Sequence, residues 1–332
     1  MEQAGATLVK HYRSLAFMGF LEVLRHLPTI LANMRFCKED IAAFQPDVLV
    51  LIDYPGFNMR IARWAHKQGF KVVYYIAPQA WAWKKGRGHK LRRTVHHLLV
   101  ILPFEEAFFG QYHLPTTWVG HPLLDAIERR PTFSRAERLQ AWQANAGKPV
   151  VALLPGSRQQ EIATMLPLML AAVNPQEQEI IVAMAPSQNR EFYQKIIGEK
   201  PIILLASATY ELLEVADAAL VTSGTATLET ALFGVPQVVC YRGSALSYWI
   251  ARRLVKVPYI SLVNLVMDRE VVTELIQQDL SPARLRRELE YCLSASGQKW
   301  FQTSYQQLRQ ELGGAGASQK AAQIIHQEAT SA

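Results

Sequence analysis

Cysteine is scarce in this sequence. Cys37, Cys240 and Cys292 are the three cysteines in 332 residues, they lie far apart, and none belongs to a C-x-x-C pair. An odd, scattered set of this kind argues against a disulfide framework and a zinc motif, and it favours a reducing compartment. The D-x-D and H-E-x-x-H motifs are also missing. The sequence therefore gives no support for a metal-dependent mechanism, and we expect neither a metal nor another cofactor.

The sequence also lacks an uninterrupted apolar run long enough to span a membrane. Residues 17–36 come closest, but Glu22, Arg25 and His26 interrupt them. Met1 is followed by Glu-Gln-Ala-Gly rather than by a basic and then an apolar segment, so we expect no signal peptide. These absences predict a cytoplasmic protein that is soluble or bound peripherally to a membrane.

Apolar residues and positive charge are what the chain has in quantity. Half of the residues are hydrophobic, 19% are charged, and the formal net charge is +7. This composition supports a full buried core, and the length suits two α/β domains better than one. The positive charge favours anionic partners such as nucleotide phosphates, nucleic acid or an anionic membrane surface.

Short apolar runs alternate with helical segments along most of the chain. The runs lie at residues 47–52, 71–76, 97–102, 117–119, 150–154, 179–183, 202–205, 218–221 and 237–241. Such alternation predicts parallel sheets covered by helices. A polar segment at residues 129–148 interrupts it. We therefore predict two doubly wound, Rossmann-like domains, over residues 1–145 and 146–332, with a helical tail from residue 283. Ligands of such sheets bind beyond the carboxyl ends of the strands.

The turn after the run at 218–221 is the strongest single signal. Ser223, Gly224, Thr225 and Thr227 stand between this predicted strand and a predicted helix. The first turn of a helix offers unpaired backbone N–H groups and a positive dipole end, so a diphosphate fits there. Glu229 lies one turn further on, where a carboxylate can hold the two hydroxyls of a ribose. An ordinary capped helix is the competing interpretation.

Three further loops after strands carry candidate residues. Ser157 and Arg158 stand in a Gly/Ser loop that has neither a Walker nor a dinucleotide fingerprint, and the arginine fork suits a phosphate. Asp53 ends a strand, where its carboxylate can take a proton from a sugar hydroxyl, or can simply form a turn. His121 follows another strand and is either a phosphate or sugar contact or a structural hydrogen-bonding residue.

Aromatic and basic residues are concentrated in one stretch. Trp81, Trp83, Lys84, Lys85 and Arg87 form it. The mixture suits a membrane interface or a nucleic-acid backbone, and a solvated helix face is the alternative. Only the positive charge favours nucleic acid, so we expect no nucleic-acid partner.

Eight segments of the chain together resemble the lipid-A-disaccharide synthase family of glycosyltransferases. In family order they are MGFLEVL (18–24), DYPGFN (53–58), PQAWAW (78–83), LPFE (102–105), VGHPL (119–123), LLPGSR (153–158), SGTATLE (223–229) and VPYISLVNL (257–265). Each segment is weak alone, but the set is specific. The resemblance implies a GT-B fold. It also implies an inverting, metal-independent transfer from a UDP-linked diacylglucosamine to a diacylglucosamine 1-phosphate, which yields a β-1,6-linked disaccharide and UDP.

The resemblance also assigns roles to residues. It places the UDP diphosphate at residues 223–227, Arg158 against the charge of the leaving UDP, Glu229 on the ribose, and Asp53 as the general base. Asn264 matches a position that touches the donor. Residues after it that are expected to meet the sugar are Glu270, Glu274 and Gln277. The implied location is peripheral, on the cytoplasmic face of the inner membrane, where the basic tryptophan-rich stretch meets acylated, anionic substrates. The oligomeric state is left open.

The sequence departs from the family pattern at two places. Family members begin with a strand and a glycine-rich G-E-x-S-G-D turn, which this chain lacks, so the first sheet is expected to be incomplete. Gly56 stands where many members carry a second Asp, which leaves a different base open. The alternatives are another GT-B UDP-sugar transferase or epimerase, or an inactive UDP-binding remnant.

Overall fold

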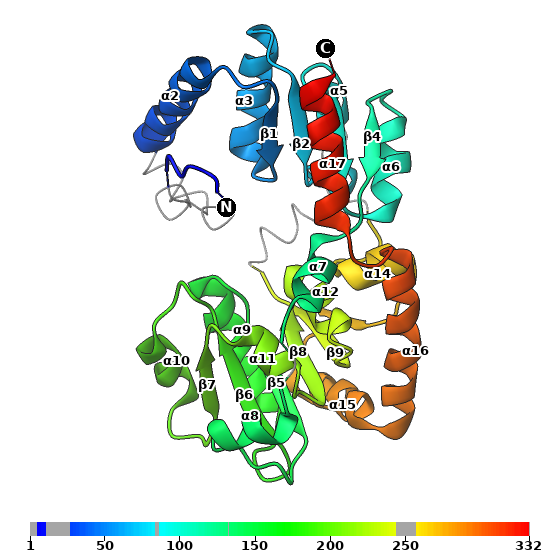
Figure 1. The fold of residues 1–332 in the computed structure, drawn as a ribbon. Helices are drawn as coiled ribbons and strands as arrows, with labels where there is room; N and C mark the ends of the chain where they lie inside the picture. Colours follow the sequence, from blue (N-terminus) through cyan, green and yellow to red (C-terminus); the bar gives the residue numbers. More distant parts are fainter. Residues whose placement is uncertain (1–4, 11–26, 84–85, 132, 244–256, 332) are drawn as a thin grey trace.

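The computed structural model describes residues 5–10, 27–83, 86–131, 133–243 and 257–331. Within these ranges the chain forms two parallel sheets with helices around them, one sheet above the other in Figure 1. All nine apolar runs of the sequence form strands. The predicted fold class, two parallel-sheet α/β domains, is confirmed.

The first sheet has four parallel strands among the described residues, in the order β1-β2-β3-β4. Its strands are β1 (Leu49–Ile52), β2 (Val72–Tyr75), β3 (His97–Val100) and β4 (Thr116–Trp118). Its helices are α2 (Leu27–Phe44), α3 (Pro55–Lys67), α4 (Ala80–Trp83), α5 (Gly86–Arg92) and α6 (Pro103–Gly110). Each strand is added on the same side of the previous one, so right-handed crossovers put the connecting helices on one face. Among the described strands the order of this sheet therefore does not reverse.

The last helix of the chain covers the other face of the first sheet. Alternate strand residues point to opposite faces, so Val73 and Leu99 point away from the side that Val72 and Leu98 occupy. They pack against α17 (Ala317–Thr330) through Ala321 and its neighbours. The helical tail was expected in the second domain. The final helix of the tail instead packs on the first domain. The connecting helices cover only one face of the first sheet, so its other apolar face needs a helix from elsewhere in the chain.

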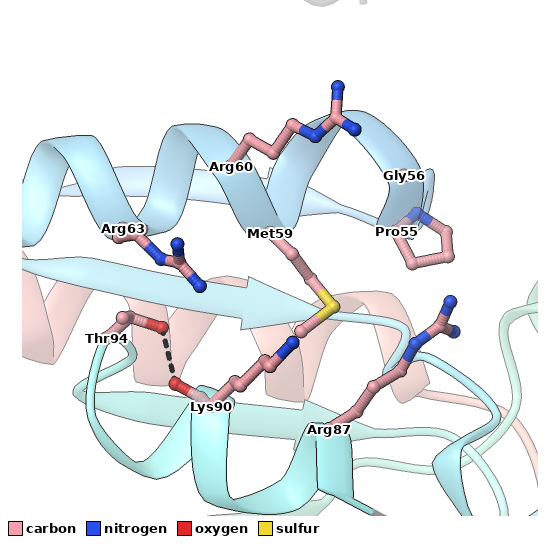
Figure 2. A pocket seen from close by; sticks show the side chains of 8 residues that line it. All are labelled: Pro55, Gly56, Met59, Arg60, Arg63, Arg87, Lys90 and Thr94. Atoms are coloured by element: carbon pink, nitrogen blue, oxygen red, sulfur yellow. Dashed lines mark hydrogen bonds between the residues drawn. The ribbon is translucent and has the colours of Figure 1, made fainter. Parts of the chain in front are cut away.

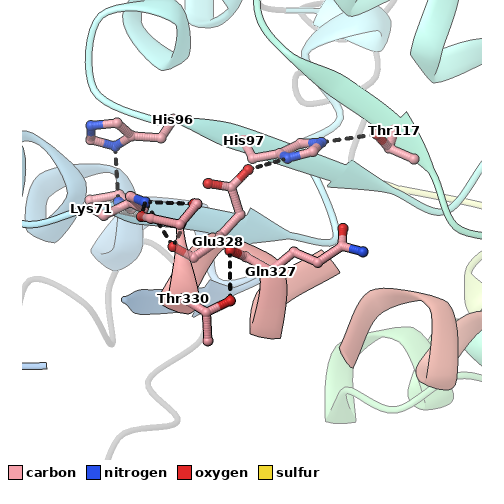
Figure 3. A network of polar contacts seen from close by, with 9 residues as sticks. Lys71, His96, His97, Thr117, Gln327, Glu328 and Thr330 are labelled. Carbon is pink, nitrogen blue, oxygen red and sulfur yellow. Dashed lines mark hydrogen bonds and ion pairs between the residues drawn. The ribbon is translucent and has the colours of Figure 1, made fainter. Parts of the chain in front are cut away.

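Polar contacts fix the end of α17 to the sheet (Figure 3). The Nδ1 of His97 lies 2.8 Å from the Glu328 carboxylate, and its Nε2 lies 2.9 Å from the Thr117 hydroxyl. Lys71 donates to the backbone carbonyls of Glu328 and Ser331 at 2.8 and 2.7 Å. The positive charge of a lysine at the carboxyl end of a helix also interacts favourably with the helix dipole.

The second sheet has six parallel strands in the order β10-β9-β8-β5-β6-β7 among the described residues. Its strands are β5 (Val150–Leu154), β6 (Glu179–Met184), β7 (Ile203–Ala206), β8 (Ala218–Thr222), β9 (Gln237–Tyr241) and β10 (Thr273–Ile276). Its helices are α9 (Gln159–Ala172), α10 (Arg190–Ile197), α11 (Thr209–Leu213), α12 (Thr225–Leu232), α14 (Leu262–Met267), α15 (Pro282–Leu293) and α16 (Ala295–Glu311). The chain builds outward from β5 to β7 and then returns to the other side of β5. Strand order therefore reverses between β5 and β8, as in a doubly wound sheet.

The connection between the two sheets runs through α7 (Pro122–Glu128) and α8 (Arg135–Ala141). Leu139 of α8 is buried in the core of the second sheet, and Arg135 pairs with Asp217 at 2.8 Å. The predicted boundary at residue 145 thus falls after a helix that already packs on the second domain. In α7, Asp125 accepts a hydrogen bond from the Ser318 N–H at 2.7 Å and so holds the start of α17.

Candidate functional site

A cavity of about 480 Å³ opens at the strand reversal of the second sheet. It lies beyond the carboxyl ends of β5, β6 and β8, which is where open α/β sheets bind ligands. The predicted residues that line it are Ser157, Arg158, Ser223, Gly224, Thr225 and Glu229. Ser157 and Ser223, which are 66 residues apart in the chain, thus meet at one place because β5 and β8 are neighbours.

The β8–α12 turn presents the start of a helix to this cavity. β8 ends at Thr222, α12 begins at Thr225, and the first turn of α12 contains no acidic residue. Backbone N–H groups at such a helix start favour an anion. Thr227 does not line the cavity: it is fully buried, and its hydroxyl donates to the Gly224 carbonyl at 2.8 Å. We conclude that Thr227 shapes the turn and that Thr225, which is exposed, faces the ligand space.

The β5–α9 loop holds the arginine at the rim of the cavity. The Glu161 carboxylate accepts hydrogen bonds from the Ser157 and Arg158 N–H groups at 3.3 Å each, and pairs with the Arg158 guanidinium at 2.6 Å. Gly156 has a φ of +107°, and a Cβ there would lie 2.9 Å from a Glu161 oxygen. The Arg158 side chain is 61% exposed, so it can turn toward an anion in the cavity.

Glu229 is held by a tyrosine that the sequence analysis did not identify. The Tyr210 hydroxyl donates to the Glu229 carboxylate at 2.9 Å. Burial raises the pKa of Glu229, and this hydrogen bond opposes the shift. A half-buried carboxylate oriented in this way can accept hydrogen bonds from a vicinal diol. Tyr210 lies in the helix that follows β7. Its position after a strand of the same sheet is the sequence feature that could have identified it.

Asp53 directly follows β1, in a strained turn of the first domain. Asp53 and Tyr54 both have a φ of +45°, a conformation that costs about 1–2 kcal/mol per residue outside glycine. The turn is held by the Asn58 amide, which donates to the Asp53 carbonyl at 2.8 Å, and by the Tyr74 hydroxyl, which donates to it at 2.6 Å. Such strain is common at functional sites. The residue itself is exposed.

His121 is buried rather than open to a ligand. It is 4% exposed and caps α7, since its Nδ1 accepts a hydrogen bond from the Leu123 N–H at 3.2 Å. Burial lowers the pKa of His121 to about 4, so the ring is neutral at pH 7. Its structural interpretation therefore fits better than a contact to an anion.

The side chains of Asn264 and Glu274 form hydrogen bonds to other parts of the protein. The Asn264 side chain is fully buried, accepts from the Val271 and Val272 N–H groups, and donates to the Glu274 carboxylate at 2.9 Å. Glu274 also accepts from the Ile260 and Ser261 N–H groups at 2.9 Å. These two residues brace α14 against β10 and do not line the cavity, in contrast to the predicted donor and sugar contacts.

The other two predicted sugar contacts are also outside the cavity lining. Gln277 donates to the Gly243 carbonyl at 3.3 Å, and Glu270 is exposed. Neither is brought next to Arg158 or Glu229 within the described cavity.

The aromatic and basic stretch is only partly a surface feature. Trp81 is 8% exposed, packs edge-to-face on Phe104, and donates to the Glu105 carboxylate at 3.0 Å, so its assignment to a membrane-facing patch is wrong. Lys84, Lys85 and the Trp83 side chain lie outside what the structure describes, as does the apolar segment 18–24. No helix of the described ranges is both long and apolar enough to cross a membrane.

Comparison with known proteins identifies relatives over nearly the whole chain. The family model described as lipid-A-disaccharide synthetase matches residues 1–328. A lipid-A-disaccharide synthase from Syntrophus aciditrophicus is 40% identical over 331 residues, which is 97% of this chain and 86% of the relative.

Solved structures agree with the fold. The chain superposes on the glycotransferase of kitacinnamycin with a TM-score of 0.61 and 14% identity, covering 98% of this chain and 87% of the other. A UDP-GlcNAc 2-epimerase from Neisseria meningitidis, solved with UDP-GlcNAc, also gives a TM-score of 0.61 at 11% identity, with coverages of 94% and 82%. At these identities the likeness concerns the two-domain architecture alone.

Proposed function

Because this chain belongs to the lipid-A-disaccharide synthetase family of glycosyltransferases, we propose that it moves an acylated glucosamine from UDP to an acylated glucosamine 1-phosphate. The new bond joins the 6-hydroxyl of the acceptor to the anomeric carbon of the donor sugar. The products are a β-1,6-linked disaccharide 1-phosphate and UDP. The observation that carries the proposal is the cavity at the strand reversal, which unites an anion-binding helix start, an arginine and a carboxylate.

In this proposal the donor occupies the cavity of the second domain. The diphosphate lies at the start of α12, against the backbone N–H groups that follow Ser223 and Gly224. Glu229 accepts the two ribose hydroxyls, with Tyr210 fixing its orientation. Arg158 turns from Glu161 to the diphosphate as negative charge grows on the leaving UDP.

Asp53 is the proposed base of the transfer. It takes the proton of the acceptor 6-hydroxyl as that oxygen attacks the anomeric carbon and the bond to UDP breaks. A single displacement of this kind inverts the anomeric centre. In Figure 1 the carboxyl end of β1, where Asp53 follows, is directed toward the second domain, as the reaction requires.

We also propose that the enzyme works at the cytoplasmic face of the inner membrane as a peripheral protein. Both proposed substrates carry acyl chains and must be met at a bilayer surface. The net charge of +7 favours an anionic surface of this kind.

UDP release tests the proposal. UDP-diacylglucosamine is incubated with and without diacylglucosamine 1-phosphate, and we expect release only when the acceptor is present. The Arg158→Ala variant should lower the rate roughly a hundredfold, the scale of a lost transition-state charge contact. Arg284→Ala, which removes a partly exposed arginine paired with Asp279 at 2.8 Å outside the cavity, is the matched control. Equal rates with UDP-GlcNAc that lacks acyl chains, or release without acceptor, would contradict the proposal.

A further inference from the structure

A second cavity lies in the first domain, between α3 and α5 (Figure 2). Its volume is about 520 Å³. Its lining residues are Pro55, Gly56, Met59, Arg60, Arg63, Arg87, Lys90 and Thr94. Four of these eight residues are arginine or lysine and none is acidic. A cavity lined by one sign of charge concentrates ligands of the opposite sign, so this one favours an anion.

Helical spacing puts these cations on facing sides of the two helices. Arg60 and Arg63 are three residues apart on α3, as are Arg87 and Lys90 on α5, and residues at that spacing share a helix face. In Figure 2, Arg63, Arg87 and Lys90 point into the space between the helices, whereas Arg60 extends over the first turn of α3. Met59 reaches into the same space and adds an apolar surface.

The positive surface continues beyond this cavity. A neighbouring cavity of about 340 Å³ shares Arg63, Lys90 and Thr94 with the first and adds Lys67 and Arg93 to its lining. Neither α3 nor α5 contains an aspartate or a glutamate. The two helices therefore hold a row of cations close together without a carboxylate of their own.

Two cations of this cavity differ from arginines elsewhere in the described part of the chain. Arg130 and Arg135 pair with carboxylates at 2.5 and 2.8 Å. Within the described residues, Arg63 and Lys90 form no ion pair. Like charges held near one another repel, and a bound anion would relieve that repulsion.

The cavity begins beside the proposed base. Asp53 directly follows β1, and Pro55 and Gly56, which line the cavity, are the first two residues of α3. Burial raises the pKa of the Tyr74 hydroxyl; the Asp53 carboxylate raises it further, and Arg87 lowers it. The Asp53 carboxylate and the Arg87 guanidinium are thus both electrostatic neighbours of this one hydroxyl.

We propose that the α3–α5 cavity binds the phosphomonoester of the acceptor glycolipid, with Arg63, Arg87 and Lys90 as its cations. This inference rests on the proposed function, in which the acceptor 6-hydroxyl meets Asp53. The 1-phosphate on C1 and the 6-hydroxyl on C6 flank the ring oxygen of one pyranose, so they require two neighbouring sites on the protein. Arginine forks match phosphate oxygens, and Met59 gives the sugar or its first acyl carbons an apolar contact.

Steady-state kinetics with two acceptors test the site. Diacylglucosamine 1-phosphate is compared with the same sugar bearing a free 1-hydroxyl, each in detergent micelles. For Arg63→Ala and for Lys90→Ala we expect the KM of the phosphorylated acceptor to rise at least about tenfold, the scale of one lost charge-assisted contact. The donor KM, and the KM of the 1-hydroxyl acceptor, should stay unchanged. Arg92→Ala is the matched control, because Arg92 is an exposed arginine of α5 that lines neither cavity.

Calorimetric titration of the phosphorylated acceptor, without donor, separates this proposal from the proposed function. Wild-type protein that binds the acceptor about tenfold more tightly than the variants, yet never releases UDP, would support the phosphate site and refute the transferase. Normal UDP release together with an unchanged acceptor KM in both variants would refute the site alone. A third measurement uses vesicles of phosphatidylglycerol or phosphatidylcholine. Variants that lose phosphatidylglycerol binding but keep their acceptor KM would show that the cations serve a lipid surface, and the proposal would be wrong.

Discussion

Replacing Asn264 with alanine should destabilise the second domain without weakening donor binding. The substitution removes an amide that joins the Val271 and Val272 N–H groups at 2.7 and 3.0 Å and the Glu274 carboxylate at 2.9 Å. Both N–H groups are buried and would lose their partner. Each such loss costs about 1–3 kcal/mol, so we expect roughly 3 kcal/mol for the variant.

Thermal unfolding measures this loss. In a domain of this size, 1 kcal/mol shifts the Tm by about 2–4 °C, so the variant should melt roughly 6–12 °C below the wild type. Asn189→Ala is the matched control. Asn189 accepts a single hydrogen bond, from the Phe192 N–H at 3.0 Å, at the exposed start of α10, and its loss should cost only about 1 kcal/mol.

The donor KM decides between a bracing role and a contact with the sugar nucleotide. Measured well below the lower Tm, the donor KM of Asn264→Ala should equal that of the wild type. A variant that melts normally but needs far more donor would refute the reasoning and return Asn264 to the donor site, as the family resemblance implies.

Three further predictions concern single residues. Burial holds the pKa of His121 near 4 against an ordinary 6.5, so between these pH values the unfolded chain binds more protons than the folded one. The free energy of unfolding should therefore fall by roughly 3 kcal/mol as the pH drops through that window. Urea unfolding at pH 7 and pH 4.5 measures this fall, and an equal fall in His121→Asn would contradict the prediction. Asp53→Asn should lower kcat by a factor of about 10²–10⁴ at unchanged Tm, and an unchanged kcat would remove it as the base. Tyr210→Phe should raise the donor KM several-fold while leaving the acceptor KM alone, because Glu229 loses its hydrogen bond; equal shifts in both constants would indicate general unfolding instead.

Local patterns in the sequence were sufficient for the strands and for the cavity between the β5 and β8 loops. Each buried apolar run formed a strand, and the loops after β5 and β8 carried Arg158 and Ser223 to the same cavity. Both results depend on short-range information: a strand needs a few consecutive apolar residues, and parallel strands place their carboxyl ends at one edge. β10 was missed, since Thr273–Ile276 contains only two strongly apolar residues and, among the described strands, pairs with β9 alone.

Burial and pairing between distant segments were decided by the tertiary structure. Trp81 looked like a surface anchor beside lysines, yet Glu105, 24 residues later, binds its indole N–H inside the core. Asn264 looked like a ligand contact, yet its amide binds the Val271 and Val272 backbone just before β10 and the Glu274 carboxylate in β10. Neither partner is implied by the local sequence, because both come from other elements.

By itself the sequence determined the two parallel sheets, the family to which the chain belongs and the loops that line the cavity of the second domain, because periodicity and short motifs are local. The tertiary structure alone decided that α17 returns to cover the first sheet and that the cations of α3 and α5 line one cavity. It also decided which polar side chains form hydrogen bonds within the fold instead of facing a ligand. These features arise from packing between elements far apart in the chain, where the apolar face of one element must be covered by whichever other element can reach it.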